Sequence, residues 1–237
     1  EQAAEAGRLV ARFHVAVDEL KHEFVGGRVG VHDTAKHLSV LEQACANLRA
    51  HRLHAAVMPL AERVLEAAGS LPSLGDGPDR IGHGDLKLNN ILFARGAPAD
   101  EPRALCLIDL DTVGPIALGH ELGDAFRSWC NPAGEDAPES VRFDMAIFEA
   151  AWGGYASAMR TSWVEEAGRA AVFGVEWISL ELCARFAADA LNESYFGFDA
   201  ERYPAAGEHN LTRARGQWAL FQAARASRDA RAIVVGV

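Results

Sequence analysis

The sequence predicts a mainly α-helical fold that carries one small β-hairpin, and three observations support this prediction. Apolar residues recur at spacings of three and four through most of the chain, from Leu9 to Phe221. This helical period gives way only between residues 81 and 112, where two short apolar runs flank a turn. The composition, 49% hydrophobic and 24% charged over 237 residues, is that of a globular chain with a sizeable core. We therefore expect a single domain over residues 1–237.

Three helices are expected before the hairpin. The first covers residues 3–20, where apolar side chains share one face, and the second resumes after Thr34. The third ends near Gly69, a plausible C-terminal cap. Residues 70–79 are rich in Gly, Pro, Ser and Asp, which predicts a loop.

The predicted hairpin pairs the run Ile91–Phe93 with the run Ala104–Ile108, across a turn at Gly96–Pro102. Helical spacing returns after Pro115. Further helices are expected around residues 122–129, 148–155 and 175–186, with a last helix after Asn210.

Charge and cysteine content narrow the possible partners. A formal net charge of -10 argues against a general surface for nucleic acid or anionic membrane, because such surfaces need Lys/Arg-rich faces. No apolar run reaches the roughly 18–20 residues of a membrane span. The four cysteines are Cys45, Cys106, Cys130 and Cys183, and their wide spacing predicts reduced core residues rather than a metal site. These features predict a cytoplasmic protein.

The most informative segment is IGHGDLKLNNILF at Ile81–Phe93, followed by LIDLDT at Leu107–Thr112. It places Asp85 and Asn90 five residues apart on one loop, with Asp109 at the end of an apolar strand. An unpaired carboxylate would be costly at that strand end, and a metal ion would offset the cost. Phosphoryl transfer needs these groups, a carboxylate that orients the attacking hydroxyl and oxygen ligands for Mg²⁺.

The pattern H-G-D-x-x-x-x-N followed by I-D resembles the aminoglycoside phosphotransferase and choline kinase superfamily, whose C-terminal lobe is related to that of protein kinases. The resemblance implies that ATP and Mg²⁺ serve phosphate transfer to a small-molecule hydroxyl. It assigns Asp85 as the catalytic carboxylate and Asn90 and Asp109 as metal ligands. Lys87 resembles the protein-kinase lysine that touches the γ-phosphate, and its alternative is a solvated surface lysine. His83 is expected to support the loop structurally.

Four further segments resemble N-acetylhexosamine 1-kinases. They are LIDLDT, ELGDAFR at Glu121–Arg127, LELCARF at Leu180–Phe186 and HNLTRARGQ at His209–Gln217. This resemblance implies a sugar acceptor contacted by Arg185 and Tyr195. The alternatives are an ion pair between Arg185 and Asp189 and a core position for Tyr195.

The residue before the LGD sequence differs from the N-acetylhexosamine 1-kinase pattern, because Glu121 stands where an aspartate is usual. Asp124 is expected either to brace the catalytic loop or, together with Glu121, to compensate the helix dipole. The sequence alone favours the helix-dipole role.

Kinases of this group have an N-terminal lobe that covers the phosphates. Residues 1–80 resemble instead the helices after the hinge, residues 81–112 the catalytic loop and metal-binding hairpin, and residues 113–237 the acceptor-binding part. The glycine cluster Gly26–Gly30 is a poor phosphate loop because no strand lysine follows it. The nucleotide lobe is thus expected to be absent, and no nucleotide-binding residue is identified.

An aminoglycoside, choline or homoserine acceptor, or a non-catalytic binding module, remains an alternative. The sequence does not predict an oligomeric state.

Overall fold

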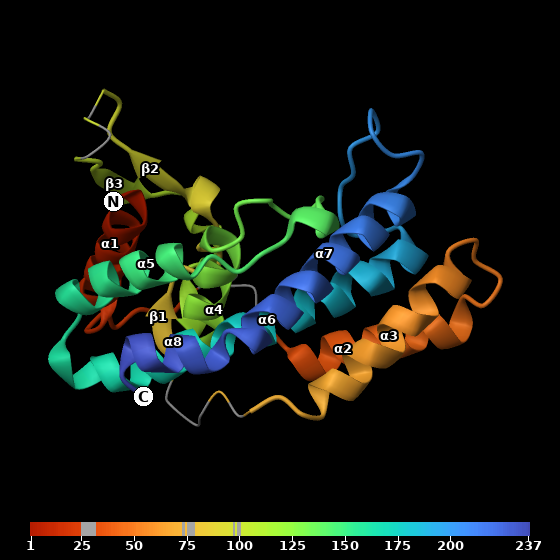
Figure 1. The fold of residues 1–237 in the computed structure, drawn as a ribbon, viewed down its shortest axis with the longest axis horizontal. Coiled ribbons are helices and arrows are strands. Elements are labelled where there is room, and N and C mark those ends of the chain that lie inside the picture. Colours follow the sequence, from red (N-terminus) through yellow and green to blue (C-terminus); the bar gives the residue numbers. More distant parts are fainter. Residues whose placement is uncertain (25–31, 73, 75–78, 97, 99–100) are drawn as a thin grey trace.

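The fold is mostly helical, as predicted, and the computed structural model describes residues 1–24, 32–72, 74, 79–96, 98 and 101–237 (Figure 1). The helices are α1 (Gln2–Val17), α2 (Thr34–Asn47), α3 (His54–Ala68), α4 (Leu118–Trp129), α5 (Met145–Ala158), α6 (Val164–Asn192), α7 (Ala206–Ala226) and α8 (Arg228–Val235). The strands are β1 (Arg80–Gly82), β2 (Ile91–Phe93), β3 (Ala104–Leu107) and β4 (Gly114–Ile116). The glycine cluster at residues 26–30 lies outside the described residues.

The predicted hairpin is confirmed, and a second pair of strands accompanies it. β2 and β3 pair antiparallel with Leu92 opposite Cys106. β1 and β4 also pair antiparallel, and Gly82 lies opposite Gly114. The sequence did not predict β1 and β4, because strands of three residues are too short for an alternating pattern. The pairing of β1 with β4 holds the two ends of the catalytic segment side by side.

The prediction for the C-terminal helices was wrong in two respects. α7 begins at Ala206 rather than after Asn210, and α8 was not expected. His209 and Asn210 lie buried in the first turns of α7. Their polar side chains resemble a helix start in the sequence, although they face the interior of the fold.

The 29-residue helix α6 runs through the molecule and joins two hydrophobic clusters. One cluster packs α1, α4, α5 and the first half of α6 around Phe126 and Phe148. The other packs α2, α3 and α7 on the second half of α6, around Leu180 and Phe221. Figure 1 shows the α2–α3 pair at one end of the molecule and the β2–β3 hairpin beside α1 at the other.

Glycines bring α4 unusually close to α6. A Cβ at Gly174 would lie 2.0 Å from the carbonyl oxygen of Gly119, and one at Gly123 would lie 2.4 Å from the carbonyl oxygen of Gly174. Only residues without a Cβ permit this approach. The contact fixes the position of α4, which carries Glu121 and Asp124 toward the catalytic loop.

Candidate active site

The catalytic loop is built around the buried ring of His83. Its Nε2 lies 2.9 Å from the carbonyl oxygen of Ile108, and its Nδ1 accepts a hydrogen bond from the backbone N–H of Asp85 at 3.3 Å. Thr112 Oγ1 donates to the carbonyl of His83 at 2.7 Å. The ring thus ties the loop to the end of the hairpin, which confirms the structural role expected for His83.

Gly84 makes the sharp turn before the aspartate. Its φ is 79°, and a Cβ there would lie 2.7 Å from the carbonyl oxygen of Thr112. A side chain would meet both backbone strain and a steric clash. This position therefore requires glycine.

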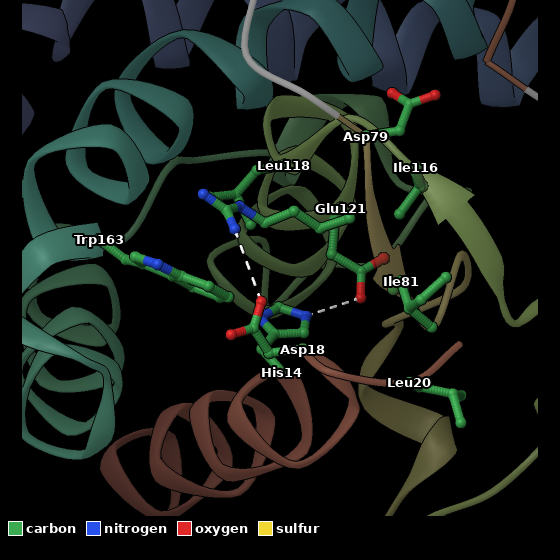
Figure 2. Close-up of a pocket in the computed structure, with 11 residues that line it drawn as sticks. His14, Asp18, Leu20, Asp79, Ile81, Ile116, Leu118, Glu121 and Trp163 are labelled. Carbon is green, nitrogen blue, oxygen red and sulfur yellow. Dashed lines mark hydrogen bonds and ion pairs between the residues drawn. The ribbon is translucent and has the colours of Figure 1, made fainter. Parts of the chain in front are cut away.

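Glu121 on α4 supports the catalytic loop through hydrogen bonds to its backbone. Sequence reasoning missed this role. Its buried carboxylate accepts hydrogen bonds from the backbone N–H groups of His83 at 2.7 Å and Gly84 at 2.9 Å. His14 Nε2 lies 3.0 Å from the same carboxylate (Figure 2). On its other side, His14 Nδ1 lies 2.9 Å from Tyr155 Oη. Burial alone raises the pKa of Glu121, but His14 and the two backbone donors outweigh it and leave the pKa lowered.

The structure adds specific contacts to the helix-dipole interpretation favoured for Glu121 and Asp124, since Glu121 does lie in the first turn of α4. Glu121 braces the loop, while Asp124 Oδ1 accepts hydrogen bonds from Arg127 Nε at 3.1 Å and Nη2 at 2.9 Å. Arg127 Nη1 also donates to Glu135 at 2.9 Å. The signal for Glu121 in the sequence was that it stands where the subgroup usually has an aspartate, but its contacts to His14 and His83 come from tertiary packing.

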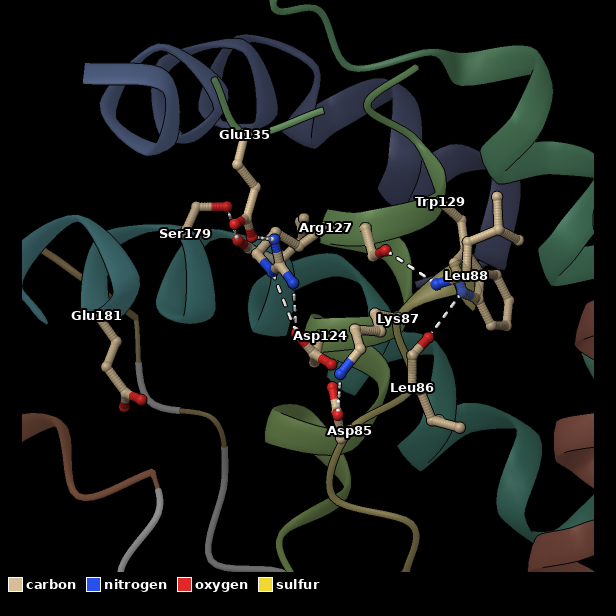
Figure 3. Close-up of polar contacts among 12 residues, drawn as sticks. Asp85, Leu86, Lys87, Leu88, Asp124, Arg127, Trp129, Glu135, Ser179 and Glu181 are labelled. Atoms are coloured by element: carbon tan, nitrogen blue, oxygen red, sulfur yellow. Dashed lines mark hydrogen bonds and ion pairs between the residues drawn. The ribbon is translucent and has the colours of Figure 1, made fainter. Parts of the chain in front are cut away.

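The four predicted catalytic and metal-binding residues lie together (Figure 3 shows Asp85 and Lys87). The ammonium of Lys87 hydrogen-bonds Asp85 and lies 3.9 Å from Asp109 Oδ2. Asn90 Nδ2 donates to the carbonyl oxygen of Asp85 at 2.9 Å and to its carboxylate at 3.0 Å. Burial lowers the pKa of Lys87, but Asp85, Asp109 and Asp124 more than offset this and leave the pKa raised. The site therefore concentrates negative charge around the ammonium group of Lys87.

The donor set fits Mg²⁺. Asp85 and Asp109 offer carboxylate oxygens, and both carboxylates contact the Lys87 cation. Asn90 offers its amide oxygen, because the amide nitrogen is the atom that bonds Asp85. Asp109 has a φ of 65°, which aims its side chain from the end of the hairpin into this cluster. In the part of the chain that the structure describes, no group of three His, Cys, Asp or Glu residues could hold a metal alone. Such a sparse set is usual for Mg²⁺, which completes its shell with substrate phosphates and water.

A cavity of about 800 Å³ opens beside the catalytic loop. Asp85, Lys87, Arg185 and Tyr195 are all among the residues that line it. The structure thus brings the residues expected for catalysis and for acceptor binding, which lie about a hundred positions apart in the sequence, into one site.

The alternative pairing of Arg185 with Asp189 is wrong. Arg185 Nη1 lies 3.8 Å from Glu181, whose carboxylate is already bonded by His32 at 3.0 Å and by Thr34 at 2.6 Å. Asp189 accepts instead from the backbone N–H groups of residues 194–196 at 2.9–3.0 Å. Tyr195 is 68% exposed, so the core alternative for this residue is also wrong.

The prediction that all four cysteines are core residues is wrong for Cys106. All four are free, and Cys45, Cys130 and Cys183 are buried, but Cys106 is exposed on β3. A two-stranded hairpin buries only part of its surface, so an apolar strand sequence does not guarantee burial. No helix among the described residues is long and apolar enough to cross a membrane.

The comparisons with known proteins agree with this geometry. A family model described as the phosphotransferase enzyme family matches residues 1–159, more than half of the chain. The chain belongs to this family. The family match, together with the fold, supports the superfamily of aminoglycoside phosphotransferases and choline kinases for this chain.

Among solved structures, the chain is similar to an ethanolamine kinase from Plasmodium vivax. The TM-score is 0.52 at 13% sequence identity, and the match covers 92% of this chain and 60% of that kinase. At this identity the likeness concerns the fold alone. The chain therefore spans about three fifths of the length of the kinase it matches.

Proposed function

We propose that this phosphotransferase transfers the γ-phosphate of ATP, with Mg²⁺, to a hydroxyl of a sugar of the N-acetylhexosamine type. The observation that carries the proposal is the shared cavity, where Asp85 and Lys87 face Arg185 and Tyr195. A phosphoryl acceptor must touch both a proton-accepting group and groups that fix its orientation.

Asp85 is the group that orients the acceptor hydroxyl and takes its proton. Its carboxylate is positioned by two contacts, the amide of Asn90 at 3.0 Å and the ammonium of Lys87. Both contacts go to Oδ2, so Oδ1 is the oxygen that the acceptor hydroxyl would approach. The transferring phosphate is the natural new partner for the ammonium, since it carries the larger negative charge.

Asn90 and Asp109 would hold Mg²⁺, which when bound offsets negative charge on the nucleotide phosphates. Both residues border Asp85 on the same loop and hairpin end. Leu92 and Leu105 are 43% and 49% exposed on the hairpin and leave an apolar surface close to these ligands. We assign no residue of this chain to the nucleotide base.

Arg185 and Tyr195 give the acceptor its contacts. The guanidinium of Arg185 lies 5.9 Å from the Tyr195 ring, and Glu181 is its closest carboxylate, at 3.8 Å. Three other carboxylates of the cavity are paired with cations, since Asp124 and Glu135 pair with Arg127 and Asp136 lies 3.2–3.7 Å from three basic side chains. Asp199, which also lines the cavity, accepts the backbone N–H of Glu201 at 3.0 Å. An acceptor rich in oxygen suits this arrangement better than a polycationic aminoglycoside, which would need carboxylates without partners.

The test is transfer of labelled phosphate from ATP by the protein expressed from its whole coding region, with Mg²⁺ and a panel of acceptors. The panel holds N-acetylglucosamine, N-acetylgalactosamine, an aminoglycoside, choline, ethanolamine and homoserine. We expect label on the N-acetylhexosamines, lowered by about 10²–10⁴-fold in Asp85→Asn. Asp229→Asn, at an exposed position of α8, is the matched control. Transfer to choline or ethanolamine instead would replace the sugar assignment, and full activity in Asp85→Asn would refute the role of Asp85.

A further inference from the structure

A second cavity, of about 400 Å³, adjoins the acceptor cavity on the far side of the segment 194–196. It lies between α2, the C-terminal half of α6 and this segment, and it is lined by Lys36, Val40, Arg185, Ala188, Tyr195 and Phe196 among others. Asp85 and Lys87 do not line it. We call it the α2 groove.

The wall between the two cavities is a preformed structure. The buried carboxylate of Asp189 accepts hydrogen bonds from the N–H groups of Ser194 and Tyr195 at 3.0 Å and from that of Phe196 at 2.9 Å. Asn210 Nδ2 donates to the same carboxylate at 3.0 Å. The hydroxyl of Ser194 also donates to it, at 3.5 Å. These donors compensate the charge, and the segment keeps its shape without a ligand.

Aromatic rings give the groove an apolar side. The Phe196 ring packs against Phe186, with 4.4 Å between ring centroids, and Tyr195 meets Phe196 edge-on at 4.7 Å. Val40 lies across from them on α2 and is 38% exposed. Flat apolar groups bind well against such rings.

The charges available in the groove are positive. Among the described residues, no carboxylate forms an ion pair with the Lys36 ammonium, which lies in the first turn of α2. Arg185 borders both cavities, and its closest carboxylate, Glu181 at 3.8 Å, is bonded to His32 and Thr34. Asp189 is the acidic residue of the groove, and its carboxylate oxygens already accept the hydrogen bonds described above.

We propose that the α2 groove is a separate binding site for a small organic anion with an apolar ring. The ring would lie against Phe196 and Val40, and the anionic group would meet Lys36 and Arg185. A volume of 400 Å³ accommodates a molecule of one or two fused rings. Since Arg185 also faces the acceptor, an anion here changes the charge presented to the acceptor cavity. The two sites are therefore coupled.

The test is isothermal titration calorimetry of the chain with three probes of equal shape, 2-naphthoate, 2-naphthalenemethanol and 2-naphthylmethylamine. We expect the anion to bind most tightly and the ammonium probe most weakly. Lys36→Glu and Val40→Glu should each weaken naphthoate binding about tenfold or more, because both place a negative charge in the groove. Glutamate is a good helix former, so both variants on the exposed face of α2 should fold.

Lys21→Glu, which makes the same charge change on an exposed residue outside the groove, should bind naphthoate as the unchanged protein does. Equal binding of the cationic and anionic probes, or full affinity in Lys36→Glu, would overturn the proposal. Loss of naphthoate binding in Lys87→Ala but not in Lys36→Glu would place the anion at the catalytic loop and would also overturn it. None of these measurements requires phosphate transfer, so they can fail or succeed independently of the proposed function.

Discussion

The carboxylate of Glu121 accepts a hydrogen bond from the backbone N–H of His83, 38 residues earlier in the chain, at 2.7 Å. The same carboxylate also receives the N–H of Gly84 and faces His14 Nε2 at 3.0 Å. A single buried side chain therefore joins α1, α4 and the start of the catalytic loop. The position of Asp85, the next residue, depends on this junction.

Removal of this junction should destabilise the protein strongly. Glu121→Ala leaves two backbone donors and a histidine buried without their acceptor, and we expect a loss of about 3–5 kcal/mol in the free energy of unfolding. Urea denaturation followed by circular dichroism measures this. Glu42→Ala, at an exposed position of α2, should change stability by no more than about 0.5 kcal/mol. A loss below 1 kcal/mol for Glu121→Ala would contradict the bracing role.

A pH-dependent contribution to stability is expected at the end of α6. The hydrogen bond from Arg52, followed by that from His51, lowers the pKa of Glu193 from 4.5 to about 2. A carboxyl group with a lowered folded-state pKa stabilises the fold above its unfolded pKa. This contribution should be complete above pH 4.5 and should disappear as the pH falls toward 2.

NMR titration of the Glu193 side-chain carbon should give a midpoint near 2. In Arg52→Ala the midpoint should move toward 4.5, because the largest cause of the shift is removed. An unshifted midpoint in the unchanged protein would show that the ion pair with Arg52 does not form in solution.

Local patterns predicted the hairpin and the residues of the catalytic loop because both depend on short stretches of sequence. The HGD motif places Asp85 and Asn90 on one turn, and the apolar run before Asp109 marks its strand. The contact between Glu121 and His14 could not be predicted, since it joins residues 107 positions apart through helix packing. The pairing of Arg185 with Asp189 failed for a related reason. Helical spacing favours the pair, but the segment after α6 turns back and occupies the aspartate.

Asp109→Asn should weaken divalent-cation binding at the hairpin end. Asparagine tolerates the left-handed backbone of this residue, so the variant removes charge without changing the backbone. Titration with Mn²⁺, followed by electron paramagnetic resonance in the presence of ATP, should require at least about tenfold more metal than the unchanged protein. Asp229→Asn serves as the control, and unchanged Mn²⁺ binding in Asp109→Asn would remove this residue from the metal site.

Arg185→Gln should separate acceptor binding from catalysis. The guanidinium faces the acceptor from across the cavity, so we expect KM for the sugar to rise about tenfold or more while kcat changes less. The measurement is steady-state phosphate transfer over a range of acceptor concentrations. Arg169→Gln, on the exposed part of α6, should leave both constants unchanged. A fall in kcat at constant KM would assign Arg185 to the chemical step instead.

The close approach of α4 to α6 yields a test that needs no substrate. A Cβ at Gly174 would lie 2.0 Å from the backbone oxygen of Gly119, so Gly174→Ala must push the two helices apart. We expect this variant to lose about 3 kcal/mol of unfolding free energy. Gly153→Ala makes the same change in α5, where nothing lies within 4 Å of the new Cβ, and it should gain about 0.5–1 kcal/mol from higher helix propensity.

Because α4 carries Glu121, movement of this helix should also alter the amide chemical shifts of His83 and Gly84 in Gly174→Ala but not in Gly153→Ala. Equal stability of the two variants would mean that the helices do not pack at this distance in solution.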